Sequence, residues 1–224
     1  MPWNKGFTKD THLSVAKISA TMRVRNIDNF KQWRDQHAVA YASLPRNGDL
    51  AEYIGVVLGD GNIERFPRTE RIVIVGDAKK MGFVYHYAEL TEKLFQKTPT
   101  IKKAKSSNAV RISLYQKFIS ERLGIPTGNK FGLAYELPQW IEVNEEYLVR
   151  FLRGLFEAEG SLSIHLPTCT YNFAFTNYNK YLLDIVARSL IKLEFHPEVR
   201  HNAIRIRRKA EVERLKNLLH FREY

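Results

Sequence analysis

Two short apolar segments, far apart in the chain, each end in an acid that is followed by glycine. The first is residues 53–61, which contains Asp60, and the second is residues 152–160, which contains Glu159. In each segment two small residues stand four positions apart, and this spacing puts them on one face of a helix. Such a face lets two helix backbones approach closely. If the two helices pack through these faces, the two carboxylates lie side by side.

The position of these acids is electrostatically unusual, because the C-terminal end of a helix carries partial negative charge and favours Lys or Arg. A carboxylate beside unpaired backbone carbonyls makes sense if a divalent cation such as Mg²⁺ binds there. Hydrolysis of a phosphodiester needs an activated water, charge neutralisation and help for the leaving oxygen, and two cations about 4 Å apart can supply all three. For one segment alone a glycine cap with a solvated acid would be the better interpretation. Two matching segments favour the metal site.

The composition favours a nucleic-acid partner. The 224 residues carry a formal net charge of +11, and 44% of them are hydrophobic, which is enough for a substantial core. A chain this basic suggests nucleic acid or an acidic membrane surface as its partner. The membrane alternative is weaker, because no apolar run approaches transmembrane length and the first residues lack an apolar signal core. We therefore expect no membrane partner.

Cysteine and histidine usage narrows the chemistry. Cys169 is the single cysteine, so neither an internal disulfide nor a cysteine-based metal site is expected. This fits a reducing intracellular compartment: the cytoplasm or nucleoid, or an organelle matrix. The seven histidines include no His-x-x-x-His pair on an expected helix, which argues against a zinc hydrolase. We expect no disulfide-linked partner.

The N-terminal part of the chain differs from the rest. Residues 11–23 predict a helix with Thr11 or Ser14 as its cap, and residues 29–41 predict a second one. Residues 44–49 are rich in Pro, Gly, Asn and Asp, which indicates a loop and a linker. This segment is therefore expected to be a separate helical unit.

An internal repeat follows the linker. After each acid-ended segment come a β-branched or aromatic strand pattern, a helical pattern, a second strand pattern and a closing helix. In the first half the patterns cover residues 71–75, 81–95, 108–112 and 115–123, and in the second half residues 171–176, 181–193, 202–206 and 209–219. Two copies of such a unit predict a pseudo-twofold pair that meets at the acid-ended helices.

The two segments resemble the signature of the LAGLIDADG homing endonucleases, in the form in which one chain carries two motifs. Residues 123–130, 137–141 and 151–156 are also similar to that family, and the resemblance covers residues 50–220. It implies an α+β fold of two pseudo-symmetric αββαββα halves, with the signature helices at their interface and saddle-shaped antiparallel sheets on the major groove of DNA. The domains expected are 1–48 (helical N-terminal extension), 49–123 (first half), 124–143 (connector) and 144–224 (second half).

The resemblance also implies an activity and a site. Such a protein would make metal-dependent double-strand cuts in a long DNA target and would be encoded in an intron or an intein. By motif position, Asp60 and Glu159 would be the catalytic, metal-binding acids, and the carbonyls of Gly59 and Ala158 would be further ligands. Two or three Mg²⁺ or Mn²⁺ ions are expected at the helix interface. The partner is double-stranded DNA, and the protein is expected to be a monomer.

One feature of the family is missing at its usual place. The family often has Gln or Lys near the end of the second strand of each half, where it orders water near the metals. The matching residues here are 76–77 and 177–178, which hold neither type. Nearby candidates for that role are Lys79, Lys80, Lys130 and Lys180. Residues 1–48 lie outside the fold, and 3–6 and 17–19 resemble a helical DNA-binding module that is found appended to homing endonucleases.

The strands are expected to carry the DNA-reading surface. Side chains alternate between the two faces of a strand, so Arg205 and Arg207 share a face opposite Ile204 and Ile206. Arg and Asn read base edges, whereas Lys more often neutralises phosphate. The candidate DNA-binding residues are Arg65, Arg68, Arg71, Lys102, Lys103, Lys105, Arg111, Ser161, Ser163, His165, Asn172, Arg200, Arg205, Arg207 and Arg208.

Three other functions compete with cleavage. A cleavage-deficient protein on the same fold, such as an RNA maturase or a regulator, is favoured by the missing Gln or Lys and opposed by the two intact acids. A general basic nucleic-acid-binding module would not need the paired segments. A glycosidase also uses two carboxylates, but a net charge of +11 has no role in binding sugar.

Overall fold

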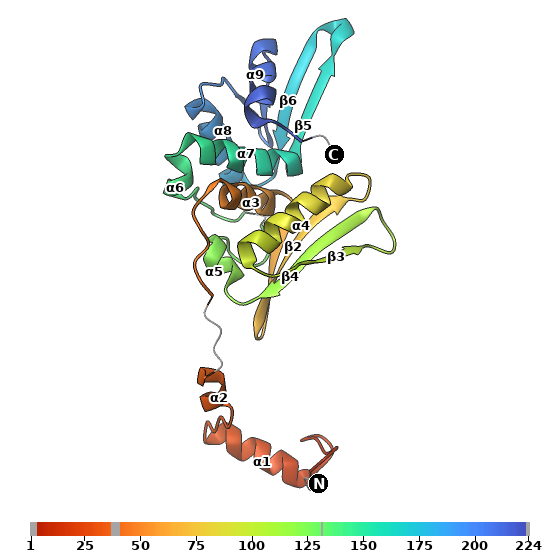
Figure 1. The fold of residues 1–224 in the computed structure, drawn as a ribbon, viewed down its shortest axis with the longest axis vertical. Helices are drawn as coiled ribbons and strands as arrows, with labels where there is room; N and C mark the ends of the chain where they lie inside the picture. Colours follow the sequence, from red (N-terminus) through yellow and green to blue (C-terminus); the bar gives the residue numbers. More distant parts are fainter. Residues whose placement is uncertain (1–3, 37–40, 131, 223–224) are drawn as a thin grey trace. The chain divides into compact units, whose positions relative to one another are not determined.

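The computed structural model describes residues 4–36, 41–130 and 132–222 (Figure 1). Contacts between residues divide the chain into two units, residues 1–41 and residues 42–224. The sequence placed this boundary at residue 48. Residues 42–47 instead pack with the second unit, because Leu44 is buried in its core and Arg122 Nε donates a hydrogen bond of 2.9 Å to the Ala42 carbonyl.

The first unit contains α1 (Leu13–Val24) and α2 (Lys31–Gln36). The N-cap of α1 is His12, which makes no side-chain capping hydrogen bond, so the predicted caps Thr11 and Ser14 are wrong. The hydroxyl of Thr11 instead accepts a hydrogen bond of 2.8 Å from the backbone N–H of Thr8, which closes a turn before the helix. No residue of α1 is buried. The predicted second helix extended to residue 41, and its residues 37–40 lie outside the described residues.

The second unit consists of two halves with the same order of elements. The first half contains α3 (Gly48–Gly59), β1 (Gly61–Phe66), β2 (Thr69–Asp77), α4 (Met81–Phe95), β3 (Thr100–Lys103), β4 (Ala109–Gln116) and α5 (Ile119–Leu123). The second half contains α7 (Glu145–Glu159), β5 (Gly160–His165), the 3₁₀ turn η1 (Leu166–Thr168), β6 (Thr170–Thr176), α8 (Lys180–Lys192), β7 (Glu198–Val199), β8 (Ala203–Ile206) and α9 (Lys209–Leu219). The connector between the halves contains α6 (Gln139–Glu142).

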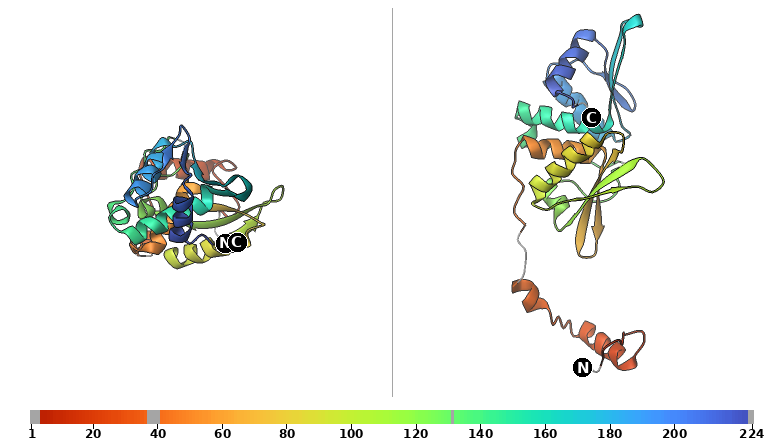
Figure 2. Two further views of the ribbon diagram at one scale, coloured as in Figure 1. Left: turned by 90° about the horizontal axis from the view of Figure 1, so that it is seen from above. Right: turned by 45° about the vertical axis from the view of Figure 1, so that its right-hand side comes forward.

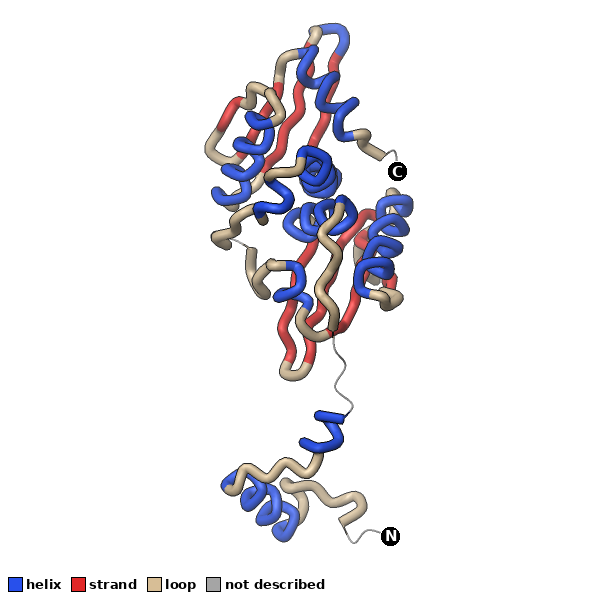
Figure 3. Tube along the Cα trace, turned by 60° about the vertical axis from the view of Figure 1, so that its left-hand side comes forward, coloured by secondary structure: helices blue, strands red, loops and turns tan. Residues whose placement is uncertain are grey.

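The internal repeat is confirmed by the topology of the sheets. The antiparallel strands run in the order β1-β2-β4-β3 in one sheet and β5-β6-β8-β7 in the other. Helix α4 packs on one face of the first sheet, and α8 and α9 pack on one face of the second. Helices α3 and α7 lie side by side between the two halves, as Figure 2 and Figure 3 show. The expected α+β class with two pseudo-symmetric halves is therefore correct.

One predicted helix is shorter than expected. The pattern over residues 115–123 predicted a helix, but β4 continues to Gln116 and α5 begins only at Ile119. Tyr115 pairs with Arg71 in the sheet, which keeps this part of the chain extended. Phe118 then adopts a left-handed conformation with φ of 59°, which separates the strand from the helix. Pairing across the sheet therefore overrides the local helical pattern.

The core of the second unit fixes the two central helices. Asn47 caps α3 by accepting a hydrogen bond of 3.0 Å from the Leu50 N–H, and Asn144 caps α7 by accepting one of 3.1 Å from the Tyr147 N–H. Every residue of α3 except Asp49 is buried, as expected for a helix that is covered on all sides.

Within the described residues, no helix has the length and apolar character needed to span a membrane.

Candidate active site at the paired helix ends

Helices α3 and α7 are in direct backbone contact. A Cβ atom on Gly55 would overlap the carbonyl oxygen of Phe151, and one on Gly154 would overlap the carbonyl oxygen of Glu52. At the C-terminal ends, a Cβ on Gly59 would lie 2.5 Å from the Cβ of Ala158. Only glycine fits at these points, so the prediction of two small faces that pack together is confirmed.

This packing brings the two acids together. Asp60 is the C-cap residue of α3, and Glu159 is the last residue of α7. Burial, together with the negative charge of Glu159, raises the pKa of Asp60 to about 6, although the ammonium of Lys130 opposes the shift. Two carboxylates that share one partly buried position repel each other, and a cation would relieve that repulsion. The site is therefore electrostatically prepared for a positively charged partner.

Lys130, from the connector, reaches the same position. Its ammonium donates hydrogen bonds to the carbonyls of Val57 (3.2 Å), Leu58 (2.9 Å) and Gly59. These are carbonyls of the last turn of α3, which have no partner within the helix. Burial lowers the pKa of Lys130, against the opposing charges of Glu159 and Asp60. In the described part of the chain, Lys130 is the one of the four candidate lysines that contacts the α3 end.

Asn179 holds the connector against the second half. Its side-chain oxygen accepts hydrogen bonds from the N–H groups of Tyr181 (2.9 Å) and Leu182 (3.3 Å) and so caps α8. Its amide donates to the carbonyls of Lys130 (2.9 Å) and Leu133 (3.0 Å). Asn179 is 8% exposed. The backbone of residue 130 is therefore fixed by a buried side chain from the other half.

A cavity of about 430 Å³ adjoins this site. It is lined by the ends of α3 and α7, the connector and the segment that joins β6 to α8, with Glu159 from α7 and Lys130 and Tyr135 from the connector. The hydroxyl of Tyr135 is buried in the cavity wall and has no hydrogen-bond partner in the described part of the chain. Glu159 of the acid pair thus borders a space that is large enough for solvent and for part of a ligand.

The residues of the site fit a divalent cation. Carboxylate and carbonyl oxygens are the ligands that Mg²⁺ and Mn²⁺ accept, and both types are present here. Within the described residues, no group of three or more His, Cys, Asp or Glu side chains is arranged for a metal. Mg²⁺ is commonly bound by one or two carboxylates plus substrate phosphates. The acid pair therefore suits a metal that is held jointly by the protein and a phosphodiester.

The predicted DNA-binding residues of the first half lie in different places. Lys102, Arg111 and Arg71 share the face of the sheet that is opposite the helices, because Lys102 pairs with Arg111, and Arg71 pairs with Glu64 and Tyr115. Arg65 and Lys103 have the opposite register and lie at exposed strand ends. Arg68 lies in the hairpin between β1 and β2, and Lys105 follows β3.

Arg71 is already engaged within the protein. Its guanidinium donates to Glu64 at 2.5 Å and to the hydroxyl of Tyr115 at 3.1 Å. It also lies 5.7 Å from the centre of the Phe66 ring and 5.6 Å from the centre of the Tyr115 ring. Such a residue contributes to sheet packing as well as to charge. Sequence reasoning missed this role, because Arg71 meets Glu64 only through the register of the β1–β2 hairpin and Tyr115 lies 44 residues away.

In the second half the predicted residues are better aligned. Ser163 pairs with Asn172, and the alternation of β5 and β6 places Ser161, His165 and Asn172 on the outer face with Arg205. Ile204 and Ile206 are fully buried while Arg205 is exposed, as the alternation predicted, but Arg207 follows the end of β8. Arg200 forms an ion pair with Glu198 (3.1 Å), and Arg208 forms one with Glu211 (3.1 Å).

Comparison with known proteins agrees with this architecture. Residues 146–224 match the family model of the LAGLIDADG-like domain. The structure is similar to that of I-DmoI in complex with DNA and Mn, with a TM-score of 0.56 and 18% identity over 80% of this chain and 100% of that one. The protein has the LAGLIDADG fold. The N-terminal LAGLIDADG domain of WhiA is similar too, with a TM-score of 0.56 and 18% identity over 83% of this chain and 88% of that one.

One curated relative differs from the LAGLIDADG proteins in its name. An alignment of 134 positions shows 26% identity to the tRNA-splicing ligase RtcB of Methanopyrus kandleri. The alignment covers 54% of this chain but only 14% of that relative. The structure is also similar to that of mesophilic variants of the homing endonuclease I-DmoI. The identity is 19% and the TM-score 0.54, over 78% of this chain and 97% of that one. At this identity the similar solved structures establish the fold of this chain alone.

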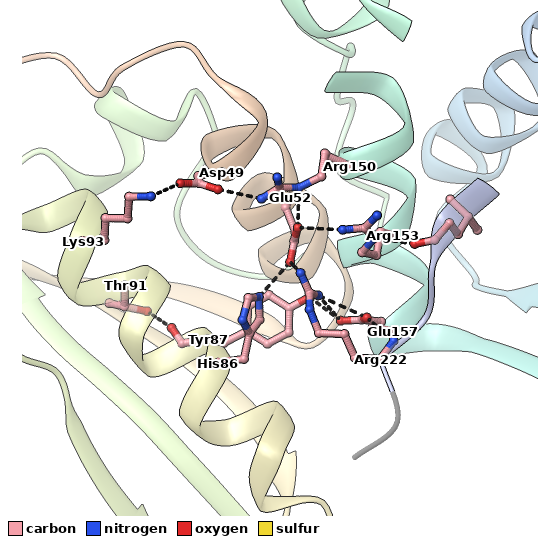
Figure 4. Close-up of polar contacts among 11 residues, drawn as sticks. Asp49, Glu52, His86, Tyr87, Thr91, Lys93, Arg150, Arg153, Glu157 and Arg222 are labelled. Carbon is pink, nitrogen blue, oxygen red and sulfur yellow. Dashed lines mark hydrogen bonds and ion pairs between the residues drawn. The ribbon is translucent and has the colours of Figure 1, made fainter. Parts of the chain in front are cut away.

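The LAGLIDADG helices also enclose an ionic network that the sequence did not reveal (Figure 4). Glu52 of α3 has no exposed surface and contacts Arg150 Nε (2.6 Å), Arg222 (2.8 Å) and His86 Nε2 (2.8 Å). Burial alone would raise the pKa of Glu52, but the hydrogen bond from His86 and the charges of Arg222 and Arg150 outweigh it and lower the pKa. The network thus ties the N-terminal part of α3 to α7, α4 and the C-terminal segment.

A second acid extends this network along α7. Glu157 accepts hydrogen bonds from the Tyr87 hydroxyl (2.9 Å) and from Arg222 (3.0 Å). Asp49 joins Arg150 (2.6 Å) and Lys93 (2.5 Å) at the other end. The available signal was an acid inside the apolar run of residues 50–58 together with two arginines three positions apart on α7. This pattern predicts a buried ion pair only if one already knows that α3 packs against α7.

Proposed function

We propose that this LAGLIDADG protein is a site-specific, divalent-metal-dependent DNA endonuclease that cuts both strands of a long target by phosphodiester hydrolysis. Because one chain supplies both halves, the protein acts as a monomer. The single cysteine fits an action inside the cell. By the family resemblance its role is homing, in which the target is the locus that lacks the intron or intein.

The observation that carries this proposal is the placement of Asp60 and Glu159. These acids follow the close contact of Gly59 with Ala158, interact through their charges, and lie between two halves with the same strand order. A symmetric position between the halves is where an enzyme needs its acids if it cuts two antiparallel strands. The pKa of Asp60, raised to about 6 by burial and by the negative charge of Glu159, supports a site that favours a cation.

Each residue of the site has a distinct task in this proposal. Asp60 and Glu159 would hold the cation, and a divalent cation bound there would supply an activated water and neutralise charge on the phosphate. The outer faces of the sheets bind the duplex, with Arg111, Arg205 and Asn172 placed to read base edges. The net charge of +11 supports a large phosphate contribution to affinity. The similar I-DmoI structures include complexes with DNA and Mn, which supports this choice of partner and metal.

A second candidate is a protein that binds nucleic acid on the same fold without cutting it. The specific observation in its favour is the contact of Lys130 with the Gly59 carbonyl, because an ammonium there already neutralises part of the charge of the acid pair. In this alternative the acids and the lysine form a structural ion cluster. The two candidates differ in one measurable property, which is strand cleavage in the presence of a divalent cation.

The test begins with DNA that the protein itself selects. Duplexes are enriched from a randomised pool by binding in Ca²⁺ and are then incubated with Mg²⁺ or Mn²⁺. We expect double-strand cleavage by the wild type. Asp60→Asn and Glu159→Gln should bind the same DNA and cut neither strand at the normal rate, whereas the exposed-acid control Asp184→Asn should cut normally. Tight, specific binding without any cleavage by the wild type would establish the second candidate instead.

A further inference from the structure

Lys130 satisfies the end of α3 in an unusual way. Its ammonium has three N–H donors, and the three carbonyls of residues 57–59 accept from them. One of these carbonyls, that of Gly59, is the oxygen that the family resemblance assigns to a metal ligand. An ammonium and a divalent cation cannot both occupy the same face of that oxygen, because their charges repel each other.

Lys130 is also held in place from outside its own segment. Asn179 uses all of its hydrogen-bonding capacity: its amide donates to the carbonyls of Lys130 and Leu133, and its oxygen caps α8. Its burial means that these bonds do not exchange freely with water. The position of the ammonium therefore results from a packed contact between the connector and the second half.

The site is asymmetric as a consequence. Lys130 contacts the end of α3, and the described residues contain no equivalent lysine contact at the end of α7. A cation that approaches the acid pair meets a second positive charge, that of Lys130, which interacts with both Glu159 and Asp60. DNA changes this balance, because a phosphate at the site offers the ammonium a different partner.

This inference rests on the proposed function. We propose that Lys130 is a built-in competitor of the divalent cation at the α3 end, positioned by Asn179, so that full metal binding requires the ammonium to leave the Gly59 carbonyl. In the absence of DNA the protein then binds divalent cations weakly. When DNA is bound, its phosphate takes over the ammonium, and metal loading is coupled to substrate.

The test measures Mn²⁺ affinity of the full chain without DNA, by electron paramagnetic resonance of free Mn²⁺. Lys130→Met should bind Mn²⁺ about tenfold more tightly than the wild type, or more, because a neighbouring positive charge is removed. Asn179→Ser, which can still cap α8 but lacks the amide donor, should show a smaller increase. Lys192→Met is the matched control, because Lys192 likewise donates to a helix-end carbonyl, that of Glu142. The Mn²⁺ affinity of Lys192→Met should equal that of the wild type.

A second measurement keeps the test valid if Lys130→Met is less stable than the wild type. Ca²⁺ should raise the melting temperature of Lys130→Met and Asn179→Ser more than that of the wild type, since a ligand that binds the folded state more tightly stabilises it more at the same concentration. Equal or weaker Mn²⁺ binding by both variants, or no binding by any of them, overturns the inference. If the wild type cuts DNA but the variants bind Mn²⁺ no more tightly, the inference about Lys130 fails and the proposed function stands. If Lys130→Met binds Mn²⁺ more tightly but the protein never cuts, the proposed function fails and the inference stands.

Discussion

Gly59 and Ala158 face each other so closely at the ends of α3 and α7 that a Cβ on Gly59 would lie 2.5 Å from the Cβ of Ala158. This distance sets the separation of the acids that follow them. Each residue is small for a positional reason, because even a methyl group on Gly59, or a side chain longer than the methyl group of Ala158, would force the two helix ends apart. The interface and the candidate active site are therefore one structural feature.

Substitution at the helix crossing tests the interface. Gly154→Ala should destabilise the protein, because the new Cβ would overlap the carbonyl oxygen of Glu52, which cannot move without shifting α3. Overpacking of this kind costs about 1–3 kcal/mol and sometimes more. Gly48→Ala is the control, since its Cβ would lie 3.4 Å from the side chain of Arg150 and make an ordinary contact. Urea denaturation of both variants measures the difference, and equal stabilities would show that α3 and α7 can separate at little cost.

The ionic network predicts a pH-dependent stability. Because the pKa of Glu52 is lowered in the folded state, its charge stabilises the fold above its ordinary pKa of 4.5, and this contribution is lost as the pH falls through the lower folded value. Glu52→Gln should cost about 3–5 kcal/mol at neutral pH, since it leaves the partly buried Arg150 and Arg222 without their buried partner. The gap in unfolding free energy from the wild type should narrow in acid. Exposed Glu89→Gln on α4 serves as control, and a gap that stays constant between pH 7 and pH 3 would contradict the assignment.

Two residues on the outer faces should affect DNA binding differently. Arg205→Ala should weaken binding to the selected target by about 1–3 kcal/mol and relax the preference at one base pair. Lys102→Ala should weaken binding to all sequences alike and reduce the slope of log affinity against log salt by about one unit. Binding to a panel of single-base variants at several salt concentrations distinguishes them. If Arg205→Ala keeps the full sequence preference, the second sheet does not read bases at this position.

The N-terminal unit can be removed at the boundary that the structure gives. A chain of residues 42–224 should fold, because it keeps buried Leu44 and the α3 cap Asn47, and no residue of α1 is buried. If residues 1–41 are an accessory DNA-binding unit, this chain should bind a long site more weakly and protect a shorter stretch from nuclease. A chain that starts at residue 49 is the comparison for folding, since it lacks both Leu44 and Asn47. An unchanged footprint would assign the N-terminal unit another role.

Local sequence patterns were sufficient to predict most elements and the acid pair. Helix α4 was expected at residues 81–95 and α9 at residues 209–219, and both have these bounds. The reason is that the periodicity of apolar residues reflects which face is buried, whatever lies against it. The small residues four apart likewise required a close helix partner, and the second copy supplied it. The strand–helix boundary near Tyr115 was missed because pairing with Arg71 decides it.

The chemical environment of the site was decided by tertiary structure alone. Lys130 is 71 residues from Gly59 in the chain, and Glu52 is 98 residues from Arg150, so no local spacing links either pair. Whether a lysine neutralises a helix end or a glutamate is buried with three arginines depends on the path of the connector and on how two helices dock. Sequence therefore determined which residues could do the chemistry, and folding determined which charges surround them, because electrostatic energies depend on distance in space and on burial.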